Sequence, residues 1–205
     1  ATWVRPVWEE LIAGAKYCEP QLQAIIGRHR PDIIVEDNVV AFPALVTAEA
    51  PFVRIVSCNP LELKGPLVPP TFSGYPTGDQ AAWDEFRERY RELHETLQAE
   101  FSAFGEERGA PPLAGLEFIP ESPFLNLYLY PAEADYRRSE PLGDRWHSLD
   151  SCVREVDEEF EPPPGDGALV YVSLGSLGSA DVELMNRLVA ALAETPHRYV
   201  VSKGP

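Results

Sequence analysis

The hydrophobic positions near the start of the chain recur with the period of a helix. In residues 6–28 the apolar side chains lie mostly three or four positions apart, which predicts an amphipathic helix. Pro20 interrupts this segment, and because proline has no amide proton we expect it to kink or restart the helix. Pro31 ends any helix. The apolar run Ile33, Ile34 and Val35 that follows predicts a parallel strand covered on both faces.

A second apolar run, from Phe52 to Ser57, predicts the next strand. Between the two strands we expect a helix from about Phe42 to Glu49, with Asn38 as its cap and Pro43 near its first turn. The order strand, helix, strand is that of a βαβ unit in a doubly wound sheet. The fold class predicted here is therefore α/β.

The clearest helix in the sequence should follow a loop rich in proline and glycine. Residues 60–80 are too long for a simple connector, and loops of this length are usually functional or mobile. After them, one face of a helix is predicted by Trp83, Phe86, Tyr90, Leu93, Leu97, Phe101 and Phe104. Two interpretations stay open: a stripe that faces the core, or an aromatic end that lines a substrate cleft beneath the loop.

The last part of the chain repeats the α/β pattern. Alternating apolar residues at 124–130 predict a further strand, and the ambiguous segment 145–155 suggests a short strand near Cys152. Residues 159–167 are acidic and rich in proline, the composition of an interdomain linker. After them we expect a strand at 169–174, a helix at about 180–194 and a strand at about 198–202.

These elements predict two α/β domains. The first spans residues 1–158, residues 159–167 form the linker, and the second begins at 168. A single βαβ unit cannot bury both faces of its strands, the chain starts at Ala1, and its only methionine is Met185. We therefore expect 1–205 to be an internal segment of a longer protein, incomplete in its first domain and truncated in its second.

Charge and cysteine usage narrow the function classes. The formal net charge of −16 argues against nucleic acid as a partner, and no basic segment favours an anionic membrane. No apolar stretch reaches the length of a membrane span. Cys18, Cys58 and Cys152 are odd in number and far apart, which favours a reducing cytoplasm over a disulfide framework. No spacing of histidine, cysteine and aspartate suggests a metal, and we expect neither metal nor cofactor.

Two candidate sites follow from the rule that ligands of open α/β sheets bind beyond the carboxyl ends of the strands. Asp37 ends the first strand, either as a turn or capping carboxylate or as a carboxylate that orients a catalytic base. Ser57, Cys58 and Asn59 end the second strand, as ligand-binding residues or as ordinary turn residues.

A third candidate lies at the start of the second domain. The segment from Gly175 to Ser179 follows a strand and precedes a helix, and free backbone N–H groups at such a junction favour phosphate oxygens. The pattern lacks the lysine of a P-loop and the spacing of a dinucleotide fingerprint. Asp181 and Glu183 also lie in the first helical turn, where they already satisfy the helix dipole.

The segments "RPDIIVEDNVVAFPA", "APFVRIVSCNP" and, after the linker, "LVYVSLGS" together resemble the family 1, UDP-glycosyltransferase-like enzymes, above all bacterial macrolide-type glycosyltransferases. The resemblance runs in consistent order over nearly the whole chain. It implies the GT-B fold, in which two Rossmann-like domains face each other. Two family features are absent from the chain: the base histidine, expected before residue 1, and the donor signature, expected after residue 205.

The resemblance also implies roles for individual residues. Asp37 matches an aspartate that partners the catalytic histidine. Ser57, Asn59 and loop 60–80 fall near the acceptor pocket, and Gly175 and Ser176 near the donor diphosphate.

The implied reaction is inverting, metal-independent transfer of a sugar from a nucleotide-diphosphate donor to a hydroxyl of a small, natural-product-like acceptor. We expect residues 1–205 alone to be inactive. The alternatives are another GT-B enzyme, such as a nucleotide-sugar 2-epimerase, and a non-catalytic binding protein of the same fold. The sequence leaves the oligomeric state open.

Overall fold

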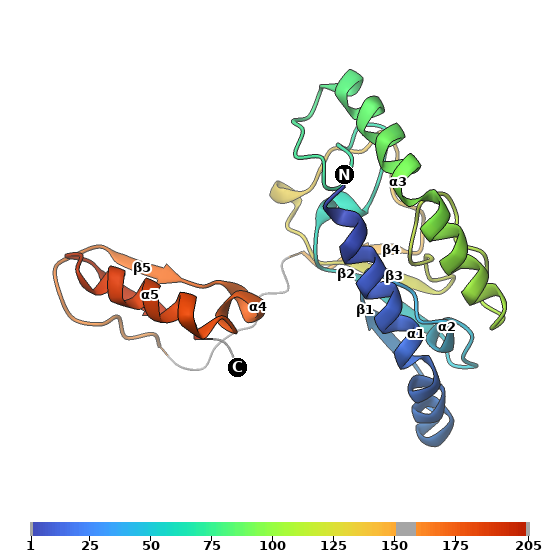
Figure 1. Ribbon diagram of the computed structural model, residues 1–205, viewed down its shortest axis with the longest axis horizontal. Coiled ribbons are helices and arrows are strands. Elements are labelled where there is room, and N and C mark those ends of the chain that lie inside the picture. The colour runs from blue at the N-terminus through green and yellow to red at the C-terminus, as the bar shows by residue number, and fades with distance from the viewer. Residues whose placement is uncertain (1, 151–158, 204–205) are drawn as a thin grey trace. The chain divides into compact units, whose positions relative to one another are not determined.

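The computed structural model describes residues 2–150 and 159–203, which belong to two compact units, Ala1–Val153 and Arg154–Pro205 (Figure 1). Each unit is described by itself. The first contains a parallel sheet with helices, a Rossmann-like α/β arrangement. Its elements are α1 (Val4–His29), β1 (Ile34–Asp37), α2 (Pro43–Val46), β2 (Phe52–Val56), the short 3₁₀ helix η1 (Pro60–Glu62), α3 (Gln80–Glu106), β3 (Leu125–Tyr128), η2 (Ala132–Ala134) and β4 (Trp146–Ser148).

The sheet of the first unit has the strand order β1-β2-β3-β4, and every neighbouring pair is parallel. Its register places Glu36, Arg54, Asn126 and Trp146 side by side in one row across the strands. The carboxyl ends of β1 and β2 therefore lie next to each other. The short strand suspected near Cys152 is β4, which ends at Ser148, and Cys152 itself lies outside the described residues.

The prediction that the first strand is covered on both faces is wrong. Buried and exposed residues alternate along β1, and Val35 is 61% exposed while Glu36 is buried. Arg54 lies on the covered face of the sheet. This face looks towards α1 and α3, since residues of both helices line the same cavity as Arg54.

α1 continues through Pro20 without a break, so the expected restart does not occur. Proline removes one intrahelical hydrogen bond, yet the helix runs on to His29, and its buried residues all lie before Pro20, from Val4 to Glu19. Buried residues of α1 recur at Val4, Trp8, Ile12 and Ala15, and they enter the main hydrophobic cluster.

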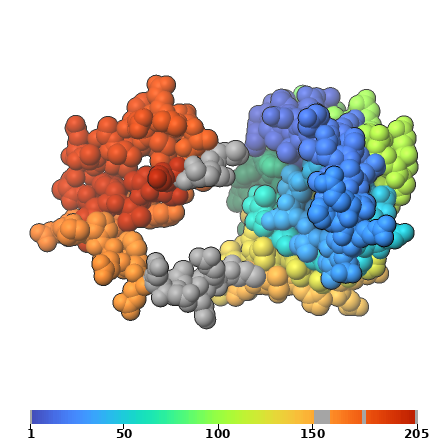
Figure 2. All heavy atoms as spheres, turned by 90° about the horizontal axis from the view of Figure 1, so that it is seen from below, coloured from blue at the N-terminus to red at the C-terminus, as the bar shows by residue number. Residues whose placement is uncertain are grey.

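α2 is much shorter than predicted, and its cap is a different residue. The helix begins at Pro43, as the proline suggested, but it ends at Val46. Asn38 lies too far upstream to cap it, and its Oδ1 accepts a hydrogen bond from the Val39 N–H at 2.7 Å. The buried carboxylate of Glu19, on α1, instead accepts from the Ala44 N–H at 3.1 Å. Figure 2 shows α1 (blue) against the segment that follows β1 (cyan).

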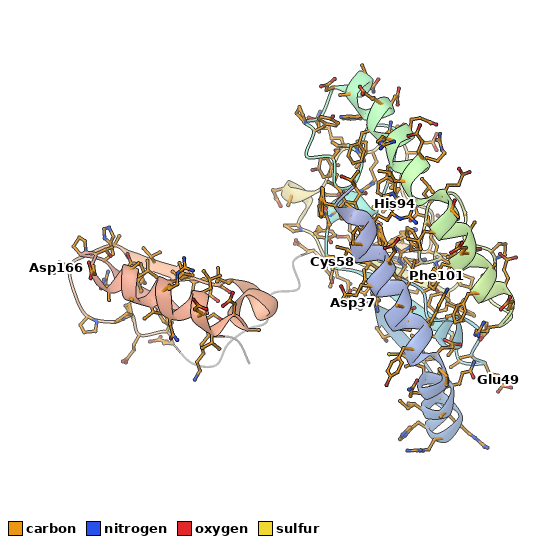
Figure 3. The ribbon with its side chains drawn as sticks, in the orientation of Figure 1. Asp37, Glu49, Cys58, His94, Phe101 and Asp166 are labelled. Atoms are coloured by element: carbon orange, nitrogen blue, oxygen red, sulfur yellow. The ribbon has the colours of Figure 1, made fainter. Side chains whose placement is uncertain are left out.

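The apolar stripe of α3 faces the hydrophobic core at one end and a cavity at the other. Phe101 is buried in the main cluster, where Leu97 and Phe104 pack against it. Phe86 and Tyr90, nearer the start of the helix, line a cavity below loop 60–80. Figure 3 shows His94 and Phe101 projecting from α3 in the first unit.

The second unit contains β5 (Leu169–Val172), α4 (Gly175–Ser179), α5 (Val182–Ala193) and β6 (Arg198–Val201), and β5 pairs with β6 in parallel. This is the predicted βαβ unit with one difference. The helix expected at about 180–194 is α5, and the junction before it, from Gly175 to Ser179, forms the separate short helix α4. Asp181 caps α5 by accepting a hydrogen bond from the Leu184 N–H at 2.9 Å.

In residues 2–150 and 159–203, none of the helices combines the length and the apolar character needed to cross a membrane.

Candidate functional site

Two of the predicted site residues meet at the carboxyl edge of the sheet. Asp37 ends β1 and Ser57 follows β2, and the parallel register brings the two positions together. The Ser57 hydroxyl lies 2.8 Å from each carboxylate oxygen of Asp37 and donates to that carboxylate. The Asp37 side chain is exposed, so most of its lone pairs stay open to a further donor.

Asn59 has a local structural role. Its Oδ1 accepts a hydrogen bond from the Leu61 N–H at 2.9 Å and thereby caps η1. This is the turn-residue interpretation that the sequence left open for this position. Asn59 also lines the cavity described next, as does Cys58.

A large cavity opens next to this edge of the sheet, with a volume of about 980 Å³. Four separate segments enclose it: the first turns of α1, loop 60–80, the start of α3 and residues 115–119. Cys58 and Asn59 belong to its lining, so Asp37 is connected to the cavity through Ser57, the residue before Cys58. Figure 3 labels Asp37 and Cys58 in this part of the first unit. A cavity of this size suits a small organic molecule.

Loop 60–80 is fastened over the cavity by its own contacts. The Trp83 indole N–H donates to the Pro76 carbonyl at 3.2 Å, and the Thr71 hydroxyl donates to the Leu61 carbonyl at 2.7 Å. Phe72 makes edge-to-face contacts with Trp3, which precedes α1, and with Trp8 of α1, at ring-centroid distances of 6.0 and 6.2 Å. The loop is therefore a wall of the cavity as well as a connection.

Aromatic side chains make up much of the cavity wall. Trp8 stacks on Phe118 at 4.3 Å between ring centroids, and its indole N–H donates to the Tyr90 hydroxyl at 2.8 Å. This hydrogen bond joins α1 to α3. Burial raises the pKa of Tyr90 to about 12, so its hydroxyl stays protonated at neutral pH.

Two charged residues, Glu36 and Arg54, lie side by side in one row across the sheet, and Arg54 reaches the cavity. Arg54, in the middle of β2, is only 5% exposed and lines the cavity, and its guanidinium lies over the Trp146 ring at 5.9 Å. Burial lowers its pKa, and the carboxylates of Glu117, Glu62, Glu121 and Glu36 act in the opposite direction. Arginine keeps its charge under such influences.

Glu36, next to Arg54 in the row, is a buried carboxyl group. Neither of its oxygens has a hydrogen-bond partner within normal geometry among the described residues. Burial raises its pKa to about 7, and the attraction of Arg54 and of the Phe42 backbone only partly offsets this.

Acidic groups collect between the cavity and Asp37. Burial is the main cause of the raised pKa of Glu62, and the neighbouring Asp37 carboxylate adds to it. Burial also raises the pKa of the Cys58 thiol, with further contributions from Glu62 and Asp37. Burial raises the pKa of the Tyr130 hydroxyl, and Glu62, Cys58 and Asp37 add to this effect, so the hydroxyl stays protonated. Cys58 is a free cysteine that belongs to the cavity lining.

The third predicted site lies in the second unit. Gly175 begins α4 with a φ of +66°, and its N–H donates to the Ser173 hydroxyl at 3.3 Å. Ser176 belongs to α4, and its side chain lies outside the described residues. The longer helix α5 starts at Val182, and Asp181 already satisfies its amino end.

The sequence reasoning missed Arg54, Glu36 and Trp8. A signal for the first two exists, because "IVED" and "FVRIV" each place a charged residue in the middle of a buried strand. Such residues are rare unless they serve a purpose.

Within residues 2–150 and 159–203, no three side chains of histidine, cysteine, aspartate or glutamate gather in a group able to hold a metal ion. No sequence model of a known protein family matches the chain, and no curated protein shows significant similarity to it.

Proposed function

We propose that these residues belong to an inverting, metal-independent glycosyltransferase of the GT-B type. It would transfer a sugar from a nucleotide-diphosphate donor to a hydroxyl of a small acceptor, and it would work in the cytoplasm without nucleic acid or membrane partners. The observation that carries this proposal is the Asp37–Ser57 pair beside an aromatic cavity of about 980 Å³. The pair combines a carboxylate able to orient a base with room for an acceptor.

In this proposal the cavity binds the acceptor and Asp37 acts through a histidine base. The resemblance places that histidine outside residues 1–205. One imidazole nitrogen takes the proton of the acceptor hydroxyl, and the other donates its N–H to Asp37, which fixes the tautomer and stabilises the imidazolium. The acceptor oxygen then forms a bond to the anomeric carbon as the bond to the nucleotide diphosphate breaks. Attack opposite the leaving group inverts the configuration.

Gly175 and Ser176 are proposed to lie near the donor diphosphate, where backbone N–H groups favour negative charge. The support is their place after a parallel strand, at the start of α4. The Gly175 N–H would have to exchange its bond to Ser173 for one to the donor.

The test is a transfer assay on the full-length protein. Incubation with nucleoside-diphosphate sugars and a panel of hydroxylated aromatic acceptors should release the nucleoside diphosphate and form a glycoside detectable by mass spectrometry. Nuclear magnetic resonance of the product should show inversion at the anomeric carbon. Retention of configuration, or epimerisation of the donor in place of transfer, would overturn the proposal. Acceptor binding without any turnover would point to the binding-protein alternative.

A further inference from the structure

Among the residues that the structure describes, Arg54 is a cavity-lining cation without an ion-pair partner. Arg54 is only 5% exposed, and its Nε–H has no hydrogen-bond partner among the described residues. In the same part of the chain, no carboxylate oxygen lies within 4.0 Å of the guanidinium. A buried cation in this condition is costly unless an anion joins it.

The other cations of the cavity wall are already neutralised. Lys64 pairs with Glu117 at 2.6 Å and Arg87 with Asp84 at 3.1 Å. Arg91 pairs with Glu88. Arg54 therefore differs from the other three, since its positive charge remains available to a ligand.

The charge of the cavity wall also differs from that of the chain. The chain as a whole carries −16, whereas the described residues that line the cavity include four cations and three carboxylates. Glu62 is the one lining carboxylate outside these ion pairs, and its pKa is raised chiefly by burial. The described side chains of this wall therefore carry no excess of negative charge, in contrast to the chain as a whole.

The remaining wall selects an apolar ring system. Arg54 shares the cavity wall with large apolar side chains, namely Trp8, Phe72, Phe86, Tyr90, Phe118 and Val68. Aromatic walls with one well-placed charged group are typical of sites for small amphipathic molecules.

We propose that the cavity binds a ring-containing organic acid whose carboxylate pairs with Arg54. As a statement about the acceptor this rests on the proposed function, and it names the acceptor class as hydroxylated aromatic or alicyclic carboxylic acids. The planar guanidinium suits a carboxylate because two of its N–H groups can donate to both oxygens at once.

The experiment compares two probes of nearly the same shape, 2-naphthoate and the neutral 2-naphthamide, by calorimetric titration of the protein near neutral pH. A charge-assisted hydrogen bond predicts that 2-naphthoate binds about 10- to 100-fold more tightly. Arg54→Gln should remove this preference and leave the affinity for 2-naphthamide close to that of the wild type. Arg87→Gln is the matched control, because Arg87 lines the same cavity but is already paired, and it should keep the preference.

Three results would overturn the proposal: equal affinity for the two probes, no binding of either, or a preserved preference in a folded Arg54→Gln protein. Circular dichroism verifies folding. Should Arg54→Gln not fold, probe binding by Arg54→Lys and by the wild type provides the test of the proposal. Binding of 2-naphthoate must then shift the Arg54 Nε–H resonance of the wild type, and 2-naphthamide must not. Glu62→Gln should strengthen 2-naphthoate binding, because it removes one of the nearby carboxylates that attract Arg54 and would repel the ligand anion.

A transfer assay separates this inference from the proposed function. The acceptors are 6-hydroxy-2-naphthoate and 6-hydroxy-2-naphthamide, with the full-length protein. Arg54-dependent binding of 2-naphthoate without transfer to either acceptor would refute the glycosyltransferase and leave the anion site standing. Equal transfer to both, unaffected by Arg54→Gln, would refute the anion site alone.

Discussion

The Ser57 hydroxyl lies 2.8 Å from both carboxylate oxygens of Asp37, although 20 residues separate the two in the sequence. The parallel pairing of β1 with β2 produces this contact, because it ends both strands at the same edge. The hydroxyl restricts rotation of the carboxylate, while the exposed side of Asp37 remains open to another donor. Ser57 is thus a positioning residue for Asp37.

Replacing Ser57 should therefore affect turnover more than binding. We expect Ser57→Ala to lower kcat of the full-length protein about 2- to 10-fold, the worth of one hydrogen bond, with little change in acceptor KM. Ser57→Thr, which keeps the hydroxyl, should restore most of the activity. Steady-state kinetics of the two variants give the answer, and an equal loss for Ala and Thr would contradict the positioning role.

Glu36 should make the protein less stable as the pH rises. Its pKa is about 7 in the folded state and 4.5 is the ordinary value, so between these values the folded state binds more protons than the unfolded state. The free energy of unfolding contributed by this group therefore falls as the pH rises from 4.5 to 7. Glu36→Gln should remove the cost, with a gain over the wild type of about 3 kcal/mol at most at pH 8 and little gain at pH 5.

The comparison of variant with wild type isolates Glu36 from other groups. His94, whose pKa burial lowers, acts in the opposite sense by destabilising the fold as the pH falls. Urea unfolding at the two pH values gives the difference directly. Glu49→Gln is the control, because Glu49 is an exposed carboxyl group (Figure 3) and should show no pH-dependent gain. A gain for Glu36→Gln that is the same at both pH values would rule out this account.

Asn126 should be among the residues on which the first unit depends most. It is fully buried in β3, its Oδ1 accepts from the Ser122 N–H at 2.8 Å, and its Nδ2 donates to the Ser122 carbonyl at 2.9 Å. Ser122 in turn donates to the Phe52 carbonyl of β2 at 2.6 Å. Asn126→Ala leaves two buried backbone groups without partners and should cost about 2–4 kcal/mol.

Chemical denaturation measures this loss. Asn38→Ala serves for comparison, because Asn38 makes one local hydrogen bond to Val39 and should cost about 1 kcal/mol or less. Equal effects of the two substitutions would show that the Asn126 network adds no stability.

Pro20 offers a stabilising substitution. The residue is exposed and lies inside α1, where proline deprives the helix of one hydrogen bond. Pro20→Ala should raise the free energy of unfolding by about 1–3 kcal/mol. Part of this gain is offset because alanine gives the unfolded chain more conformational entropy than proline does. An increase in the urea midpoint checks this, and a decrease would mean that the proline ring has a packing role in the helix.

The sequence was sufficient for the elements whose signals are local. The apolar runs of β1 and β2 and the stripe of α3 predicted those elements, and they placed Asp37 and Ser57 at the carboxyl ends of two strands, whereas the hydrogen bond between them emerged only from the structure. The extent of α2 was not predictable, because its amino end is satisfied by Glu19 from another helix.

The cavity could not be read from the sequence either. Its walls come from four segments between Trp3 and Ile119, and only their packing brings them together. Arg54 gave a local signal as a charge within an apolar strand, but its lack of an ion-pair partner among the described residues depends on where Glu36, Glu62 and Glu117 are placed by the fold. Tertiary placement of this kind leaves no periodic trace in a sequence.

The effect of Asp37→Asn on turnover tests the central claim most directly. If Asp37 orients the base, the amide presents the wrong partner to the imidazole, and kcat of the full-length protein should fall by about 10²–10⁴ with KM and thermal stability nearly unchanged. Asp32→Asn, an exposed substitution before the start of β1, should leave kcat unaffected. Near-normal turnover of a folded Asp37→Asn protein would contradict the account, since a turn carboxylate is replaced by asparagine at little cost.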